Sequence, residues 1–244
     1  MSTSEVQRAN QLYALKSTKV ASAITTVRRN IRNHGLRAAI YDVVIRSINK
    51  FVYMKTLECV VLEEVDTGSI TLPPHLRCAR LDSTALSLFG RVKENELPEE
   101  FVEDALDAGD ECFAVMDGST LASYGWYSKV PTVVDGDLRL HFDPHYVYMY
   151  KGFTSKHYRG QRLHAIGMML ALNEYRNQGF EGLVAYVESN NFDSLKSCYR
   201  LGYKRCGRIR VLRLAGRFFI HRDRGCSDYG IELQPISFDL GYVQ

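Results

Sequence analysis

The order of strand and helix patterns places this chain of 244 residues in the mixed α/β class, with helices packed on a sheet. Three observations support this class. Strand and helix patterns alternate from about residue 77 onward. The composition, 45% hydrophobic and 24% charged, is typical of a globular protein with a substantial core. A helix pattern over 162–178 lies between two strand patterns, which is typical of a crossover between parallel neighbours.

The first 55 residues combine a helix pattern with most of the positive charge. Apolar residues recur at helical spacing within about 20–54, and Gly35 is expected to separate two helices. Ten Lys and Arg face only Glu5 and Asp42, so this segment carries +8 in a chain whose net charge is +3. A solvated helix face is the favoured interpretation. An acidic protein or an anionic membrane surface is the alternative partner.

Two other roles of this segment are disfavoured. Its most apolar run is interrupted by four charged residues, so it is not expected to span a bilayer: Arg37, Asp42, Arg46 and Lys50. Binding of nucleic acid is disfavoured because aromatic stacking positions do not alternate with the cations.

A domain boundary is expected near residue 70. The segment 59–66 reads as a short strand, and TLPPHL at 71–76 then breaks the chain with a pair of prolines. We therefore expect a basic helical extension with a short strand over 1–70, followed by the main domain over 71–244.

The elements of the main domain are predicted from apolar periodicity and from Gly and Pro residues, which mark the ends of helices and strands. Pro98 is expected in the first turn of a helix, and Gly179 and Gly202 are expected to end two others. A loop containing Pro131 and Asp135-Gly136 is expected to follow the meander of strands. The predicted strands are 77–81, 111–117, 120–128, 138–142, 145–153, 182–188, 206–220 and 226–234, and the predicted helices are 82–89, 98–108, 162–178 and 191–201.

Cysteine usage indicates a reducing compartment. The six cysteines are scattered, with no C-x-x-C pair and no zinc spacing, and the N-terminal residues lack the apolar run of a secretion signal. These features predict a cytoplasmic protein. The alternation of His141, Asp143 and His145 suggests a metal, but Pro144 interrupts the strand and no fourth ligand is evident, so no metal is expected.

Five basic or imidazole side chains lie within nine positions, between a strand and a helix: Lys156, His157, Arg159, Arg162 and His164. A strand, a cationic turn and a helix N-terminus together present free backbone N–H groups to an anion. Gly160 lets the backbone approach closely, and Arg159 and Arg162 add charge-assisted contacts. The pattern predicts a phosphate site, although neither G-x-G-x-x-G nor a Walker loop occurs here.

Two stretches resemble the GNAT acyltransferase superfamily. HYRGQRLHAIG is similar to the family's R-x-x-G-x-G/A phosphate loop, with Arg162 and His164 in place of its two glycines. ESNNFDSLKSCYRLGY is similar to the family's second signature, an Asn followed by a helix that closes with L-G-Y. The resemblance covers roughly 77–234 and implies a mixed twisted sheet of about seven strands flanked by helices. Only Gly takes positive φ without strain, so a loop that carries Arg162 can still use its N–H groups if it keeps to negative φ.

The resemblance also implies the parts of an acyl-CoA site. The strand before the loop splays from the next strand in this family, and the pantetheine arm lies in the gap. The implied cofactor-binding residues are Gly152, Phe153, Thr154, Arg159, Gly160, Gln161, Arg162, Leu163, His164, Ala165, Asn191 and Ser194.

The implied catalytic residues depart from the family pattern. Relatives often place a Tyr seven residues after the Asn, as the acid for the leaving thiolate. Here that position is Cys198, and Tyr199 follows it; core packing of both residues is an equal alternative. Glu188 is the candidate general base, although a surface or capping carboxylate is favoured at that position.

The resulting hypothesis is a cytoplasmic N-acyltransferase, most simply an N-acetyltransferase, that uses acetyl-CoA or another acyl-CoA and a small-molecule or peptide amine. Two alternatives stay open: transfer from acyl carrier protein, which is acidic and suits the basic segment, and a non-catalytic acyl-CoA sensor or scaffold. A homodimer is also left open.

Overall fold

The computed structural model describes residues 25–49, 51–64, 72–135 and 137–236. These residues fall into two compact units. One contains the chain up to Met54 together with Asn190–Phe192, and the other contains Lys55–Ser189 and the chain from Asp193 onward. The domain boundary predicted near residue 70 lies outside the described residues and stays a prediction. The same holds for the helix expected at 20–24.

In its described residues, the first unit contains two helices. Residues 25–34 are helical, and α2 spans Leu36–Ile48, with Gly35 between them at a φ of +85°. The predicted break at Gly35 is therefore confirmed. Asp42 is 1% exposed and accepts hydrogen bonds from Asn30 Nδ2 at 3.0 Å, from Asn190 Nδ2 at 2.9 Å and from Arg46 Nε at 2.7 Å. This carboxylate links the two helices to the turn at 190–192.

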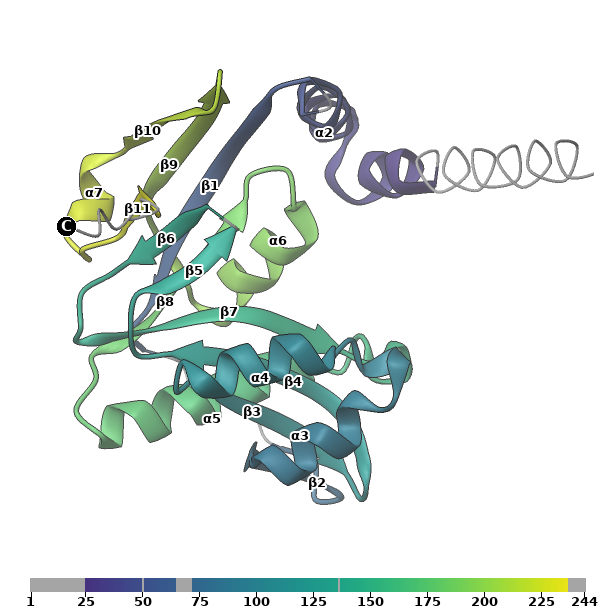
Figure 1. The fold of residues 1–244 in the computed structure, drawn as a ribbon. Helices are drawn as coiled ribbons and strands as arrows, with labels where there is room; N and C mark the ends of the chain where they lie inside the picture. The colour runs from purple at the N-terminus through teal and green to yellow at the C-terminus, as the bar shows by residue number, and fades with distance from the viewer. Residues whose placement is uncertain (1–24, 50, 65–71, 136, 237–244) are drawn as a thin grey trace, which may run out of the picture. The chain divides into compact units, whose positions relative to one another are not determined.

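An eight-stranded mixed sheet is the main element of the second unit (Figure 1). Its strands in spatial order are β10 (Arg217–Arg222), β9 (Lys204–Leu214), β1 (Tyr53–Leu62), β8 (Gly182–Glu188), β7 (Tyr146–Thr154), β4 (Thr120–Ser128), β3 (Glu111–Asp117) and β2 (Leu76–Leu81). A smaller sheet contains β11 (Glu232–Pro235), β6 (Leu138–His141) and β5 (Thr132–Asp135).

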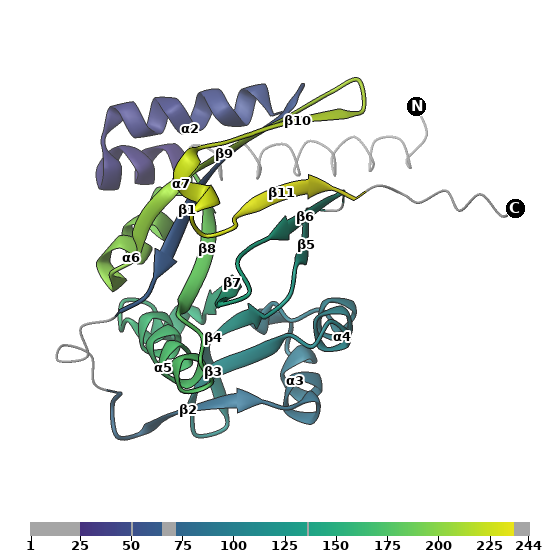
Figure 2. The same ribbon diagram turned by 90° about the vertical axis from the view of Figure 1, so that its left-hand side faces the viewer.

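Helices cover both faces of the large sheet (Figure 2). On one face lies α5 (Leu163–Asn177), and on the other lie α3 (Ser83–Gly90) and α4 (Glu99–Asp107). Strand alternation explains the two cores, because Phe113 faces α5 whereas Cys112 and Ala114 face α3 and α4. The remaining helices are η2 (Lys93–Asn95), η3 (Lys156–Tyr158), α6 (Phe192–Leu201) and α7 (Arg224–Ser227).

The mixed α/β class and the parallel crossover through α5 are confirmed, since β7 and β8 pair in parallel. Three expectations were wrong in detail. The strand expected at 59–66 runs over Tyr53–Leu62 and lies in the middle of the large sheet, where β8 pairs with it. Residues 132–135, expected in a loop, form β5. The closing strand expected at 206–220 is a hairpin of β9 and β10. Of the strand expected at 226–234, the first two residues belong to α7, and β11 begins only at Glu232.

Among the described residues, none of the helices combines the length and the apolar character that crossing a membrane requires.

Candidate functional site

The large sheet opens between its two parallel strands. β7 and β8 are paired only from Tyr146↔Gly182 to Tyr148↔Val184. Beyond that point β7 continues to Thr154 beside β4, and β8 continues to Glu188 beside β1. The facing edges of β7 and β8 therefore leave backbone donors and acceptors for another molecule.

A β-bulge lies in β7 next to this opening. Gly125 of β4 is opposite Gly152, but Tyr127 is opposite Met149, so Tyr150 and Lys151 share one partner position. A bulge changes which face the following side chains occupy. As a result Tyr150 and Lys151 both reach Phe101 of α4, at a ring-centroid distance of 6.3 Å and an ammonium-to-centroid distance of 3.9 Å respectively.

Two side-chain hydrogen bonds hold the loop from β7 to α5. The hydroxyl of Tyr158 donates to Asp117 Oδ2 at 2.9 Å, and Arg159 Nε donates to the Thr154 carbonyl oxygen at 3.2 Å. Gly160 has a φ of +85°. The first amide that bonds back within α5 is that of Ile166, to the Arg162 carbonyl at 3.1 Å, so the amides of residues 163–165 have no acceptor inside the helix.

The condition of a negative φ at Arg162 is not met. Its φ is +61° and its ψ is +19°, in the left-handed region, at the N-cap of α5. The backbone at this position therefore has the conformation that favours glycine, the residue of the family motif. The loop keeps the left-handed turn although the side chain makes it costly.

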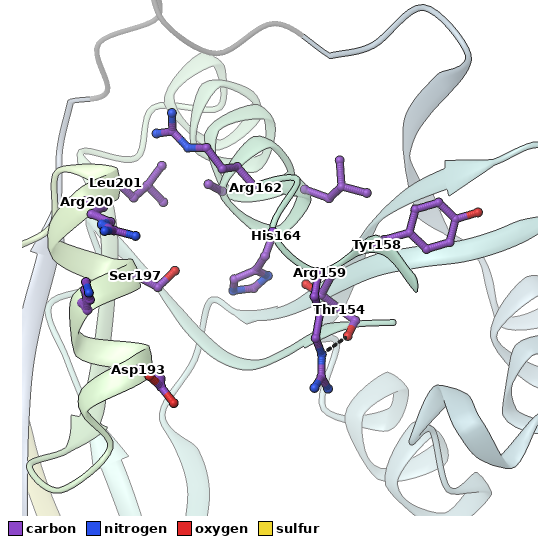
Figure 3. Close-up of a pocket in the computed structure, with 13 residues that line it drawn as sticks. Thr154, Tyr158, Arg159, Arg162, His164, Asp193, Ser197, Arg200 and Leu201 are labelled. Atoms are coloured by element: carbon purple, nitrogen blue, oxygen red, sulfur yellow. Dashed lines mark hydrogen bonds between the residues drawn. The ribbon is translucent and has the colours of Figure 1, made fainter. Parts of the chain in front are cut away.

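A cleft of about 410 Å³ lies in front of these amides, between the loop and α6. Figure 3 shows its two walls, with Thr154, Arg159 and His164 on one side and α6 on the other. Four cationic side chains and one carboxylate reach it, so its charge suits an anion. The lining residues are Thr154, Tyr158, Arg159, Gly160, Arg162, Leu163, His164, Ala165, Asp193, Lys196, Ser197, Arg200 and Leu201.

Seven of the residues predicted for the cofactor line this cleft: Thr154, Arg159, Gly160, Arg162, Leu163, His164 and Ala165. Gly152, Phe153, Gln161 and Ser194 are not part of its lining. Asn191 belongs to the other compact unit. Phe153 stacks on Tyr124 at 5.1 Å within the core under α4.

Sequence reasoning missed the wall formed by α6. Lys196 and Arg200 lie four residues apart, and Asp193 and Ser197 repeat the same spacing, so all four lie along one side of the helix. This periodicity was visible in the sequence. What the sequence did not show was which side of the helix faces the loop.

His164 and Gly152 fit each other in shape. A Cβ atom placed on Gly152 would lie 2.4 Å from His164 Cε1, so the imidazole fills the space of the missing side chain. Burial lowers the pKa of His164 to about 4, with a hydrogen bond to the Tyr124 backbone acting in the opposite direction. The imidazole is therefore neutral at physiological pH.

The three catalytic candidates lie outside the cleft. Cys198 packs against the core under α5, and burial raises the pKa of its thiol to about 11. Tyr199 is 45% exposed. Glu188, at the end of β8, pairs with Lys55 at 3.0 Å. Their catalytic roles stay predictions.

Asp143 and His145, two of the residues weighed above as metal ligands, contact each other. Asp143 Oδ1 accepts from the His145 backbone amide at 2.8 Å and contacts His145 Nδ1 at 2.7 Å. These hydrogen bonds lower the pKa of Asp143. In the part of the chain that the structure describes, no group of three or more His, Cys, Asp or Glu is arranged to hold a metal ion.

The fold agrees with a comparison of the sequence with protein families. The model of the acetyltransferase (GNAT) family matches residues 79–203, just over half of the chain. The chain therefore belongs to the GNAT acetyltransferase family. None of the curated proteins matches it.

The solved structures to which this chain is similar share little sequence with it. A GCN5-related N-acetyltransferase-like protein from Streptococcus suis is 14% identical, with a TM-score of 0.47 over 70% of this chain and 66% of that one. A Drosophila protein is 12% identical, with a TM-score of 0.47 over 72% and 57%. An aminoglycoside N-acetyltransferase in complex with CoA is 16% identical, with a TM-score of 0.44 over 63% and 99%. The chain spans less than two thirds of the first two structures, and similarity at this level says nothing about the substrate.

Proposed function

We propose that this chain is an acyl-CoA-dependent N-acyltransferase that moves an acyl group directly to an amine. One observation carries the proposal: a cationic cleft at the N-terminus of α5 lies beside the opening between β7 and β8. A diphosphate needs donors and positive charge, and a pantetheine arm needs exposed strand edges. Both features occur next to each other in this family member.

The residues of the cleft suit the diphosphate of CoA. The amides of residues 163–165 point out of the helix N-terminus, where the helix dipole favours negative charge. Arg159 and Arg162 from the loop, with Lys196 and Arg200 from α6, would add charge-assisted contacts. Bound acyl-CoA would supply the activated thioester. The chain's part is to hold it and to exclude water.

The side chain of His164 affects how the arm can be held. Its imidazole covers Gly152 on β7, the strand to which the arm is assigned. It stays neutral, so it adds no charge beside the thioester, and its nitrogens can donate or accept hydrogen bonds.

The test is a thermal-shift series with CoA, acetyl-CoA and longer acyl-CoAs. A ligand present at 100 times its dissociation constant adds about 2.7 kcal/mol to stability. For a chain of this length that corresponds to an increase in Tm of about 5 to 10 °C. Absence of any shift across the series would refute the proposal.

Charge-reversal variants locate the binding site. Arg200→Glu should weaken CoA binding at least tenfold, because it places a carboxylate in the anion cleft. Arg91→Glu is the matched control, since Arg91 is exposed after α3, which covers the opposite face of the sheet. Equal losses in both variants would indicate a nonspecific charge effect.

A non-catalytic acyl-CoA-binding module is the second candidate. The observation that favours it is the position of Cys198, Tyr199 and Glu188, none of which lines the cleft. Release of free thiol from acetyl-CoA in the presence of a panel of amines and peptide N-termini decides between the two. Binding of CoA without thiol release would favour the module. The same assay with acylated carrier protein as donor tests the carrier-protein alternative.

A further inference from the structure

Exposed apolar side chains are concentrated in the first unit. Of the fifteen large apolar side chains that are exposed in the described part of the chain, eight lie within residues 31–51. Exposed apolar residues are ordinary when they are scattered singly, whereas a cluster of them marks an interaction surface. The eight are Ile31, Leu36, Ile40, Tyr41, Val43, Val44, Ile48 and Phe51.

The helix α2 has the opposite orientation to that of a solvated amphipathic helix. Its exposed apolar residues recur at helical spacing along one side, which we call the apolar face: Leu36, Ile40, Val43, Val44 and Ile48. The buried residues of α2 are Ala39 and Asp42, and the Asp42 carboxylate accepts hydrogen bonds from Asn30 and Asn190. A polar network is therefore inside and the aliphatic residues are outside. A helix face that meets only water would have the reverse arrangement.

The charge around the apolar face is positive. In the sequence, residues 25–49 contain a single carboxylate and five arginines: Arg28, Arg29, Arg32, Arg37 and Arg46. The carboxylate is the buried Asp42, which pairs with Arg46 at 2.7 Å, so it does not offset the other four arginines. Arg28, Arg32 and Arg37 are exposed. A surface that complements this unit must therefore offer both negative charge and an apolar environment.

An anionic lipid bilayer offers both. Apolar side chains of a helix that lies in its surface enter the boundary between headgroups and acyl chains, and arginine stems extend to the headgroups. The thirteen residues of α2 span about 20 Å, less than the roughly 30 Å of the hydrocarbon core, so the helix suits the plane of the surface. A second copy of this chain would supply apolar contacts, but it would bring like charges together.

Phe51 extends the apolar face beyond the end of α2. Its side chain is 87% exposed, the largest exposure of any of the eight. A bulky aromatic residue next to an aliphatic stripe, bordered by arginines, is the composition of helices that bind the membrane interface. This composition favours lipid over an acidic protein, for which the charge alone would suffice.

We propose that the first unit binds the surface of an anionic lipid bilayer. The apolar face and Phe51 enter the boundary of the acyl chains, and the exposed arginines contact the anionic headgroups. None of the residues of the anion cleft belongs to this surface, so the role is independent of the proposed acyl transfer.

Vesicle flotation with the full chain tests the inference. The vesicles contain phosphatidylcholine alone, or phosphatidylcholine with 30% phosphatidylserine. In 0.1 M NaCl the wild-type protein should partition at least tenfold more strongly into the vesicles with phosphatidylserine, and 0.5 M NaCl should weaken this partition. Equal partition into the two kinds of vesicle, or into neither, would overturn the inference.

Two apolar double variants of matched exposure test the contribution of the apolar face. Ile40→Gln/Val44→Gln should weaken partition at least tenfold, because it removes two side chains from the acyl-chain boundary. Leu88→Gln/Val92→Gln is the control in the second unit and should behave as the wild type. The exposures match, at 54% for Ile40 and 55% for Leu88, and at 47% for both valines. Unchanged partition of Ile40→Gln/Val44→Gln would show that charge acts alone and would overturn the inference.

A charge variant tests the arginines. Arg28→Gln/Arg32→Gln should weaken partition into the anionic vesicles about 25-fold, since each cation near such a surface contributes about fivefold. Arg91→Gln/Lys93→Gln removes two exposed cations from the second unit and should change little. Equal losses in the two variants would overturn the assignment to the first unit. Circular dichroism checks that every variant keeps the helix content of the wild type.

Two further measurements separate this inference from its alternatives. Light scattering without vesicles gives the mass, and a dimer of the wild type that Ile40→Gln/Val44→Gln dissociates would assign the apolar face to a second copy and overturn the lipid surface. The thermal shift with CoA should be the same in this variant and in the wild type. Vesicle binding without any response to CoA would refute the acyltransferase alone, and a response to CoA without vesicle binding would refute the membrane surface alone.

Discussion

Replacement of Arg162 by glycine and by alanine separates the conformational role of this residue from its charge. Both variants remove the guanidinium from the anion cleft. Only glycine relieves the left-handed conformation, which the backbone holds at a φ of +61° and a ψ of +19°. We therefore expect the two variants to bind CoA equally weakly and to differ in stability.

The expected difference follows from backbone energetics. A left-handed conformation costs an L-residue about 1 to 2 kcal/mol, and glycine avoids this cost. Glycine in turn loses about 0.5 to 1 kcal/mol of stability because its unfolded state has more conformational entropy. Arg162→Gly should then be about 1 kcal/mol more stable than Arg162→Ala, which corresponds to about 2 to 4 °C in Tm for a protein of this size.

Thermal and urea unfolding measure this difference in stability. Gly160→Ala is the reference variant for the cost of a left-handed alanine in the same loop. Gly160 has a φ of +85°, and a Cβ atom added there would meet nothing within 4 Å, so its substitution reports conformational strain alone. That variant should lose about 1 kcal/mol or slightly more. An alanine variant at position 162 that is as stable as the glycine variant would show that the loop does not keep the left-handed turn.

Three further predictions concern the two units and the cleft. Asp42→Ala should lower the free energy of unfolding of the first unit by about 3 kcal/mol, since its buried carboxylate accepts three hydrogen bonds. Glu111→Gln should destabilise the protein near neutral pH. Burial raises the pKa of Glu111, but the hydrogen bond from Tyr175 and nearby cations lower it by more, so the pKa in the folded protein lies below the ordinary value. The stabilisation from the ionised carboxylate is therefore lost as the pH falls below about 4.3. His164→Ala should remove the part of the wild-type stability that is lost between about pH 6.5 and pH 4, because the folded protein holds this imidazole neutral.

Each of these has a distinct measurement and a distinct failure. Urea unfolding of Asp42→Ala that overlays the wild-type curve would show that the carboxylate adds no stability. A constant stability difference between wild type and Glu111→Gln from pH 7 to pH 3 would contradict the lowered pKa. For His164, parallel pH–stability curves of the variant and the wild type would contradict the neutral imidazole.

The sequence predicted the parts of this protein that depend on neighbouring residues. Apolar periodicity placed β3, β4, β8 and α5 within a residue or so, and glycines marked the ends of α5 and α6. The clustered cations before α5 and the loop motif located half of the anion cleft. These features are local, because helix and strand periods and turn residues act over a few positions.

The rest of the site required the tertiary structure. The sequence showed that Lys196 and Arg200 share one side of a helix, but packing alone brought that side against the loop. The pairing of Asp110 with Tyr150, forty positions apart, depended on the register between β3, β4 and β7 and on a bulge that periodicity does not reveal. The central place of β1 also came from pairing with β8, a strand more than a hundred residues away. Contacts between distant segments are decided by the packing of the whole sheet. The pattern along the chain determines only the secondary structure of each segment and which of its side chains share a face.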